Sequence, residues 1–210
     1  MTFIFRLNLK IIEMKIFLTF IGLFVSTVLV AQIDPDHLML GETAPSIVGK
    51  DQNGKLINSK EILKEHQILL IFYRGNWCPH CMKHLGSLQT HLQEFQEKGV
   101  FIMVVTPEKL EKTMETGNQF ENEFSIIHDV NNKIMIDYKV AFEVNKETVP
   151  VYYEKLNDRL AEYNEANNNV LPVPATYLID KSGKIAYVQY DPDYKKRSNL
   201  DEILELLDQP

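Results

Sequence analysis

Two apolar runs on either side of a helix-like segment constrain the fold of this chain more than any other feature. Residues 67–73 and 100–105 are continuous apolar runs of the length expected for buried strands. Between them, four large apolar residues recur at helical spacing: Leu85, Leu88, Leu92 and Phe95. A strand, a helix and a second strand of these lengths form a βαβ unit, so the two strands are predicted to be parallel.

The flanking segments extend this unit into an α/β domain. Before it, short extended pieces surround a predicted turn at Asn53 and Gly54, and Ser59 is a candidate cap for a short helix. Further elements are predicted after it: helices at 107–117, 131–140, 146–166 and 200–207, a strand at 122–129, and a hairpin over 173–190 with Ser182 and Gly183 in its turn. These elements predict a central mixed sheet flanked by helices.

Composition bounds the class of protein. The chain has 210 residues, of which 45% are hydrophobic and 10% aromatic, so it can form the core of one domain. Its formal net charge of −7 argues against a nucleic-acid partner, which would require a basic face. Two cysteines are too few for a scaffold held together by disulfides.

The N-terminal segment has the layout of a signal peptide. Met14 and Lys15 precede an apolar run over 16–30, and Ala31 is a small residue suited to a cleavage site. The run is shorter than the ~20 residues that a membrane span needs, although an uncleaved anchor is an alternative. We predict a signal peptide over 1–31, with 1–13 as an over-long start, and a mature domain over 32–210. The protein is then exported to the periplasm or another extracytoplasmic compartment, without a stable membrane span after cleavage, where disulfides persist.

Both cysteines belong to a single Cys-x-x-Cys motif. Pro79 suits the first position of a helix, which places Cys78 at the helix N-terminus, where free N–H groups and the helix dipole favour a thiolate. Cys81 follows one turn later and is close enough to form a disulfide with it. Arg74 and His80 add positive charge nearby. The pattern therefore predicts a redox-active dithiol.

Other uses of the motif fit less well. A zinc site needs four ligands, and no second Cys-x-x-Cys is present to supplement the helix that carries Cys81 and His84. A c-type haem requires His directly after the second Cys, where this chain has Met82. A static disulfide across two residues would restrict the unfolded chain very little. No metal and no cofactor are expected, and His84 and His91 are predicted to be solvated surface residues.

Four stretches resemble a known family: 41–55 (GETAPSIVGKDQNGK), 71–81 (IFYRGNWCPHC), 171–185 (LPVPATYLIDKSGKI) and 191–197 (DPDYKKR). The chain resembles the thioredoxin-like superfamily and, more closely, the peroxiredoxin-like branch of the alkyl hydroperoxide reductase/thiol-specific antioxidant group. This resemblance implies a thioredoxin-like fold, a hydroperoxide or protein disulfide as substrate, and a thioredoxin-like dithiol as reductant. It also implies a cis peptide bond before Pro174, facing the dithiol, the alternative being a trans proline that opens a strand. We expect Pro174, Trp77 and Arg74 to contact substrate.

The chain departs from the family in two places. Peroxiredoxins carry Pro-x-x-x-Thr-x-x-Cys, and alignment on that pattern puts Cys81 at the attacking position, Cys78 at the Thr and Arg74 at the Pro. The helix position instead favours Cys78 as the better exposed thiolate, so the attacking sulfur stays open. Thioredoxins also carry a buried acid six residues before the first Cys. Phe72 occupies that position here, so a proton relay through that carboxylate is absent.

The sequence therefore predicts an exported thiol-based antioxidant oxidoreductase. It would reduce hydroperoxides through a Cys78–Cys81 dithiol/disulfide cycle supported by an external thiol reductant. A thiol-disulfide oxidoreductase that acts on protein disulfides is a first alternative. A non-enzymatic binding module on a thioredoxin fold is a second, because a fold alone does not determine a function.

Overall fold

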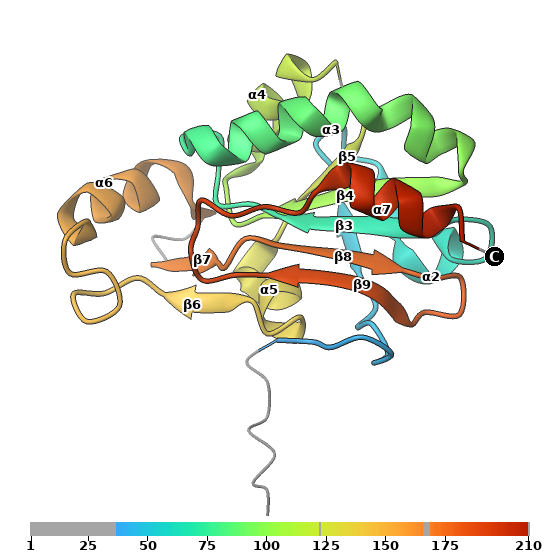
Figure 1. Cartoon of the computed structure of the whole chain (residues 1–210). Helices are drawn as coiled ribbons and strands as arrows, with labels where there is room; N and C mark the ends of the chain where they lie inside the picture. Colours follow the sequence, from blue (N-terminus) through green and yellow to red (C-terminus); the bar gives the residue numbers. More distant parts are fainter. Residues whose placement is uncertain (1–36, 122, 166–168, 210) are drawn as a thin grey trace, which may run out of the picture. The chain divides into compact units, whose positions relative to one another are not determined.

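One five-stranded sheet organises the domain (Figure 1). A computed structural model of the chain describes residues 37–121, 123–165 and 169–209, so the expected signal peptide over 1–31 lies outside the described residues. The strand order is β5-β4-β3-β8-β9. Strands β5, β4 and β3 run parallel, whereas β8 is antiparallel to β3 and β9 is antiparallel to β8. The predicted mixed sheet flanked by helices is confirmed.

The elements follow the chain in a regular alternation. The strands are β1 (Val48–Lys50), β2 (Leu56–Asn58), β3 (Gln67–Phe72), β4 (Val100–Thr106), β5 (Ser125–His128), β6 (Ala141–Glu143), β7 (Val170–Pro172), β8 (Ala175–Ile179) and β9 (Ile185–Tyr190). The helices are α2 (Ser59–Ile62), α3 (Pro79–Glu97), α4 (Leu110–Gln119), the 3-10 turn η1 (Val130–Asn132), α5 (Lys133–Asp137), α6 (Tyr153–Tyr163) and α7 (Leu200–Leu207). The antiparallel β1–β2 pair confirms the predicted first hairpin, and β8–β9 confirms the second.

The predicted βαβ unit is present as β3, α3 and β4. Gln67 pairs with Val100 and Phe72 with Val105 in a parallel register. Side chains of a strand alternate between the two faces of a sheet. Accordingly, Leu69 and Ile71 belong to the core on one side of the sheet, and Ile68, Leu70 and Phe72 belong to the core on the other.

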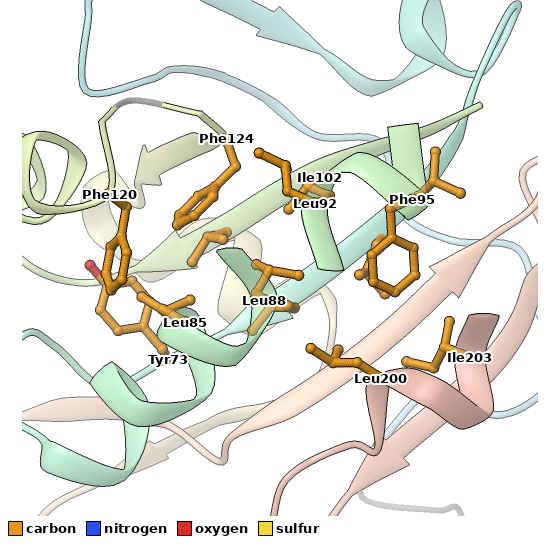
Figure 2. Packing of buried hydrophobic residues seen from close by; sticks show 14 of the residues in the cluster. Tyr73, Leu85, Leu88, Leu92, Phe95, Ile102, Phe120, Phe124, Leu200 and Ile203 are labelled. Carbon is orange, nitrogen blue, oxygen red and sulfur yellow. The ribbon is translucent and has the colours of Figure 1, made fainter. Parts of the chain in front are cut away.

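Helices α3 and α7 cover the first face (Figure 1). Figure 2 shows Leu88 and Phe95 of α3 beside Leu200 and Ile203 of α7, in the space between the helices and the sheet. Leu88, Phe95 and Ile203 have no exposed surface. Complete burial of such side chains contributes about 1.5–3 kcal/mol each, so this contact fixes α3 firmly on the sheet. The N-terminus of α3 is thereby held in place.

Aromatic side chains fill much of the second face. The rings of Phe72 and Tyr138 have centroids 5.3 Å apart, and that of Tyr177 lies 5.5 Å from Tyr138. Helix α5 and the β1–β2 hairpin add Met135 and Ile57 to the same cluster. This second core packs against β3 from the other side, so the carboxyl end of β3 is rigid on both faces.

The prediction of a long helix over 146–166 is wrong about where the helix begins. Helix α6 begins at Tyr153, because the side-chain oxygen of Asn145 accepts the N–H groups of Glu147 and Thr148 at 2.9 Å each and closes a local turn instead. The two-stranded β6–β7 pair beside it has no counterpart in the prediction.

Two helix starts also differ from prediction. Asn58, not Ser59, caps α2, accepting the N–H of Lys60 at 3.0 Å, while the hydroxyl of Ser59 accepts the N–H of Ile47 at 2.8 Å. Helix α4 begins at Leu110 rather than at 107, which leaves Glu108 in the loop after β4. In the part of the chain that is described, no helix has the length and apolarity needed to cross a membrane.

Candidate active site

The two cysteines lie at the start of α3, just after the turn that follows β3. Cys78 is the N-cap residue of α3 with extended backbone angles, φ −96° and ψ 109°, and Pro79 is the first helical residue. The carbonyl of Cys78 accepts the N–H of Cys81 at 3.0 Å and that of Met82 at 3.1 Å. This is the position that the sequence predicts for Cys78, at the positive end of the helix dipole.

Both sulfurs are covered. Cys78 and Cys81 are free thiols with 0% and 1% of their surface exposed, and both belong to the core beneath α3. The expectation that Cys78 is the better exposed of the two thiols is therefore wrong. Trp77 packs against this core, and Arg74, itself 8% exposed, hydrogen-bonds to the Cys78 sulfur. These neighbours separate the sulfur from solvent.

The guanidinium group of Arg74 is the positive charge beside the sulfur of Cys78. Its Nη2 donates to Cys78 Sγ at 3.2 Å. The guanidinium carbon lies 4.2 Å from the ring centroid of Tyr194 and 5.3 Å from that of Trp77. Two aromatic faces therefore hold the guanidinium against the sulfur.

The two thiols have opposite acid strengths. A hydrogen bond from the Cys81 thiol, reinforced by the charge and hydrogen bond of Arg74, outweighs burial and lowers the pKa of Cys78 to about 5. Burial and the neighbouring Cys78 raise the pKa of Cys81 well above its ordinary value, against the opposing charge of Arg197. Near neutral pH the pair therefore comprises one thiolate and one thiol, which is the state required for nucleophilic attack followed by disulfide formation.

A tight turn joins Arg74 to Cys78. Gly75 has φ +148°, and a Cβ there would lie 2.4 Å from Trp77 Nε1 and 2.7 Å from Glu108 Oε1. The N–H of Cys78 donates to the carbonyl of Gly75 at 3.1 Å. Only glycine fits this turn, which brings Arg74 back over the sulfur four residues later.

The buried carboxyl group of Glu108 stabilises this turn through hydrogen bonds. Glu108 has no exposed surface, and it accepts the N–H of Asn76 at 2.9 Å and the hydroxyl of Tyr73 at 3.0 Å. Burial, partly offset by these two hydrogen bonds, raises its pKa to about 7. Sequence reasoning missed Glu108 because it considered an acid only at position 72. The available signal was its place directly after a predicted parallel strand, at the sheet edge where functional groups collect.

The expected cis proline is wrong. No cis peptide bond occurs in the described ranges, so the Val173–Pro174 bond is trans, the ordinary state of such a bond. The N–H of Val173 donates to the carbonyl of Val140 at 2.8 Å, and this keeps the chain extended into β8. Pro174 nevertheless lines one cavity together with Arg74, the residue that contacts Cys78.

Two cavities flank Arg74. One of about 300 Å³ is lined by Pro174, Phe142 and Tyr190 together with Arg74. The other, of about 230 Å³, is lined by Trp77, Tyr152 and Arg74. The structure thus brings together the three residues expected to contact substrate, with Arg74 between the two cavities.

The segment after β9 completes the site. Tyr194 covers Arg74, and Arg197 Nη2 donates to Cys81 Sγ at 3.3 Å. The sequence matched this segment to a family but gave no reason to place it against a cysteine 116 residues away. The ring of His80 lies edge-on to that of Tyr194, with centroids 5.7 Å apart, and its expected effect on the thiolate stays a prediction.

The environment of His84 differs from the prediction of a solvated surface residue. The side chain is buried rather than solvated, with 7% of its surface exposed, and its Nε2 lies 3.2 Å from the hydroxyl of Ser198. Burial and the charge of Arg197 lower its pKa to about 4, so it is neutral at physiological pH. Within the described residues, no three His, Cys, Asp or Glu side chains are grouped as a metal ion would require.

Comparison with known proteins decides the family. Residues 40–188 match the model of the AhpC/TSA family. The chain belongs to the AhpC/TSA family. The expected peroxiredoxin-like membership is thus confirmed, on a match that spans the dithiol, β8 and most of β9.

Curated proteins similar to this AhpC/TSA chain include thiol-disulfide oxidoreductases and peroxiredoxins. Thiol-disulfide oxidoreductase ResA of Bacillus cereus is 26% identical over 153 residues, which are 72% of this chain and 70% of the relative. Chloroplastic peroxiredoxin Q of Sedum lineare is 21% identical over 167 residues, 80% of this chain and 76% of the relative. Both kinds are redox enzymes by name, and the expectation that the chain is an oxidoreductase is confirmed.

Solved structures support the fold. Peroxidoxin BcpB of Mycobacterium tuberculosis superposes with a TM-score of 0.62 at 16% identity, covering 81% of this chain and 97% of that one. A cysteine-to-serine mutant of PrxQ from Xylella fastidiosa gives a TM-score of 0.63 at 12% identity, covering 81% of this chain and 96% of that one. The thioredoxin-like fold of the AhpC/TSA family therefore extends over nearly all of the described chain.

Proposed function

We propose that this AhpC/TSA protein is an exported thiol peroxidase in which Cys78 attacks the peroxide and Cys81 resolves the product. The observation that carries the proposal is the contact of 3.2 Å between Arg74 Nη2 and the sulfur of Cys78 at the N-terminus of α3. Both features favour a thiolate, which is the reactive form of a cysteine. The Cys81 thiol beside it supplies the second sulfur of the cycle.

The steps follow from the two protonation states. The Cys78 thiolate attacks the terminal oxygen of a hydroperoxide, and the O–O bond breaks. Cys78 becomes a sulfenic acid, and the alkoxide takes a proton and leaves as an alcohol, or as water from hydrogen peroxide. The sulfur of Cys81 then attacks Cys78, the hydroxyl group leaves as water, and a disulfide forms. An external dithiol reduces this disulfide and is itself oxidised.

Arg74 has two roles in this scheme. Its guanidinium stabilises the thiolate before attack, and it can donate a hydrogen bond to the peroxide oxygen on which negative charge develops. The apolar and aromatic walls of the cavities beside it, which include Trp77 and Pro174, would bind the remainder of the substrate. We assign these three residues to substrate binding.

Burial of the sulfurs favours a peroxide over a protein disulfide as oxidant. A small hydroperoxide can enter beside Arg74, whereas a protein disulfide must reach a sulfur that has no exposed surface. Once the disulfide forms, Cys78 loses its negative charge, and the hydrogen bond that holds Arg74 over it weakens. The external dithiol would then reach Cys78 in the oxidised protein.

A thiol-disulfide oxidoreductase acting on protein disulfides is the second candidate. The Cys-x-x-Cys motif favours it, as do the relatives named thiol-disulfide oxidoreductase. The two candidates share the dithiol cycle and differ in the oxidant.

Export completes the proposal. The layout of residues 1–31 supports a removable signal peptide and a mature domain over 32–210 in the periplasm or another extracytoplasmic compartment. The intact mass of the protein recovered after export tests this proposal, with Gln32 expected as the first residue. Recovery of the complete chain would contradict it.

The peroxidase test compares the wild type with Cys78→Ser and Cys81→Ser. Hydrogen peroxide and cumene hydroperoxide consumption is followed with a thioredoxin, thioredoxin reductase and NADPH system, in parallel with insulin reduction. We expect peroxide turnover in the wild type only, and a dimedone-trapped sulfenic acid on Cys78 in the Cys81→Ser variant. Insulin reduction without peroxide turnover would favour the second candidate, and a sulfenic acid on Cys81 alone would reverse the assigned order of attack.

A further inference from the structure

The sulfur of Cys81 also has a guanidinium group beside it, that of Arg197. Arg197 Nη2 donates to Cys81 Sγ at 3.3 Å, so each thiol is paired with a different arginine from a different part of the chain. The other ionisable side chain that shifts the pKa of Cys81 is that of Cys78, and His84, one turn further along α3, is neutral at physiological pH. Arg74 faces Cys81 with its backbone. Arg197 is therefore the side-chain cation available to this sulfur.

Several contacts hold Arg197 in place. Its Nη1 donates to the carbonyl of Lys196 at 2.6 Å and also to that of Tyr194. The next residue, Ser198, is buried and hydrogen-bonds through its hydroxyl to Thr176 at 3.0 Å and to His84 at 3.2 Å. The guanidinium is thus oriented before the reaction, as a group that stabilises developing charge must be.

In the reduced protein, Cys81 carries no negative charge that Arg197 could stabilise. Cys81 is the protonated member of the reduced pair, and a buried charge on its sulfur would be costly without a partner. Negative charge reaches Cys81 at a different stage of the cycle. When a thiolate opens the disulfide by attacking Cys78, the electron pair of the broken S–S bond goes to Cys81.

The geometry points to Arg197 as a catalytic residue of the reductive half-reaction, which binds the sulfur of Cys81 as it leaves as a thiolate. The inference rests on the proposed dithiol cycle. The reductant thiolate forms an S–S bond with Cys78 while the Cys78–Cys81 bond breaks. The second thiol of the reductant then displaces Cys78, which leaves as a thiolate, and one proton from the reductant passes to Cys81. The reductant ends as a disulfide and the protein as thiolate plus thiol.

The expected size of the effect follows from the leaving group. An opposite charge at this distance lowers a pKa by about 1–3 units. Exchange rates rise as the pKa of the leaving thiol falls, and a dependence of the same size as that on the attacking thiol corresponds to a Brønsted coefficient of about 0.4–0.5. Removing the guanidinium should therefore slow the opening of the disulfide about 3- to 30-fold.

The experiment measures reduction of the oxidised full-length protein by dithiothreitol in a stopped-flow instrument, through the fluorescence of Trp77, the single tryptophan. Arg197→Met should show the slowing, and Arg197→Lys should keep part of the wild-type rate. Lys196→Met is the matched control: it removes an adjacent exposed positive charge, which pairs with Asp191, and should stay within about two-fold of wild type.

A second readout separates catalysis from a structural role. In a Cys78→Ser background, absorbance at 240 nm against pH gives the pKa of Cys81, which Arg197→Met should raise by about 1–3 units. If Arg197→Met fails to fold, Arg197→Gln, which is uncharged and keeps a polar N–H donor, takes its place in both measurements.

The outcomes distinguish this inference from the proposed function. An unchanged reduction rate in a folded Arg197 variant overturns the inference. So does slowing by Arg74→Met in its place, because the charge would then leave on Cys78. Neither measurement uses peroxide, so a wild type without peroxide turnover refutes the proposed oxidant while the role of Arg197 is still tested. A wild type that forms no Cys78–Cys81 disulfide refutes the dithiol cycle and with it the inference.

Discussion

The carboxyl group of Glu108 accepts the backbone N–H of Asn76 at 2.9 Å, and so ties the loop after β4 to the turn before the dithiol. The same group accepts the hydroxyl of Tyr73 at the end of β3. The buried carboxyl group of Glu108 therefore links the ends of two neighbouring parallel strands, β3 and β4, next to the segment that carries Arg74.

Glu108→Gln should alter how stability depends on pH. Burial raises the pKa of Glu108 in the folded state to about 7, above its ordinary value of 4.5. A raised pKa contributes stability that is complete below the unfolded value and is lost as pH rises through about 7. Glutamine does not ionise and so lacks this pH dependence. Between pH 5 and pH 8 the unfolding free energy of the wild type should therefore fall relative to that of Glu108→Gln, by up to about 3 kcal/mol.

Urea unfolding of the oxidised protein at both pH values measures this shift, because the oxidised form has no thiol ionisation to confuse it. The same difference between variant and wild type at pH 5 and pH 8 would contradict the prediction.

Cys81 should control the acidity of Cys78 through its hydrogen bond. The Cys81 thiol is the largest cause of the lowered pKa of Cys78. Cys81→Ala removes the donor and should raise the pKa of Cys78 by about one unit or more, whereas Cys81→Ser keeps a hydroxyl donor and should raise it less. The rate of alkylation by iodoacetamide against pH gives both values. Equal pKa values in the two variants would show that the hydrogen bond is unimportant.

Gly75 should be far less tolerant of substitution than Gly86. Gly75→Ala places a Cβ against Trp77 and Glu108 in a left-handed backbone region, with an expected loss of about 1–3 kcal/mol for the backbone alone. Gly86, inside α3, has open space around it, and Gly86→Ala should add about 0.5–1 kcal/mol. Urea midpoints of the two variants should move in opposite directions, and a neutral Gly75→Ala would disprove the tight turn.

Tyr194 should limit access to Cys78. Its ring lies 4.2 Å from the guanidinium carbon of Arg74, and such a contact is worth about 0.5–2 kcal/mol. At pH 8, where Cys78 is a thiolate in every variant, Tyr194→Ala should react with 5,5′-dithiobis(2-nitrobenzoic acid) about 2- to 30-fold faster. Tyr194→Phe retains the ring and should react like the wild type. A slower reaction in Tyr194→Ala would mean that the ring does not hold Arg74 over the sulfur.

Local patterns predicted the sheet and the position of Cys78 well. The apolar run of β3, the helical spacing in α3 and the glycine turn of the β8–β9 hairpin each depend on neighbouring residues. Periodicity and turn chemistry are encoded at this range. The α3 N-terminus followed from Pro79, one residue after Cys78.

The remaining site residues depend on contacts between distant segments. From the loop after β4, Glu108 contacts the turn before the dithiol, and from the segment after β9, Tyr194 contacts Arg74 and Arg197 contacts Cys81. No local pattern encodes such a meeting. The exposure expected for Cys78 failed for the same reason, because the side chains of Arg74 and Trp77 cover it only when Tyr194 and the core are in place.

Because Tyr194 and Arg197 come from the segment after β9, the surroundings of the dithiol are complete only when the whole domain has folded. In an extended chain both cysteines are ordinary thiols with a pKa of about 8.5, of which only about 3% is ionised at pH 7. In the folded domain the pKa of Cys78 is about 5, and that thiol is almost fully ionised. A newly made, unfolded chain therefore carries a nearly inert pair of sulfurs, and the speed of its thiol chemistry reports when folding has finished.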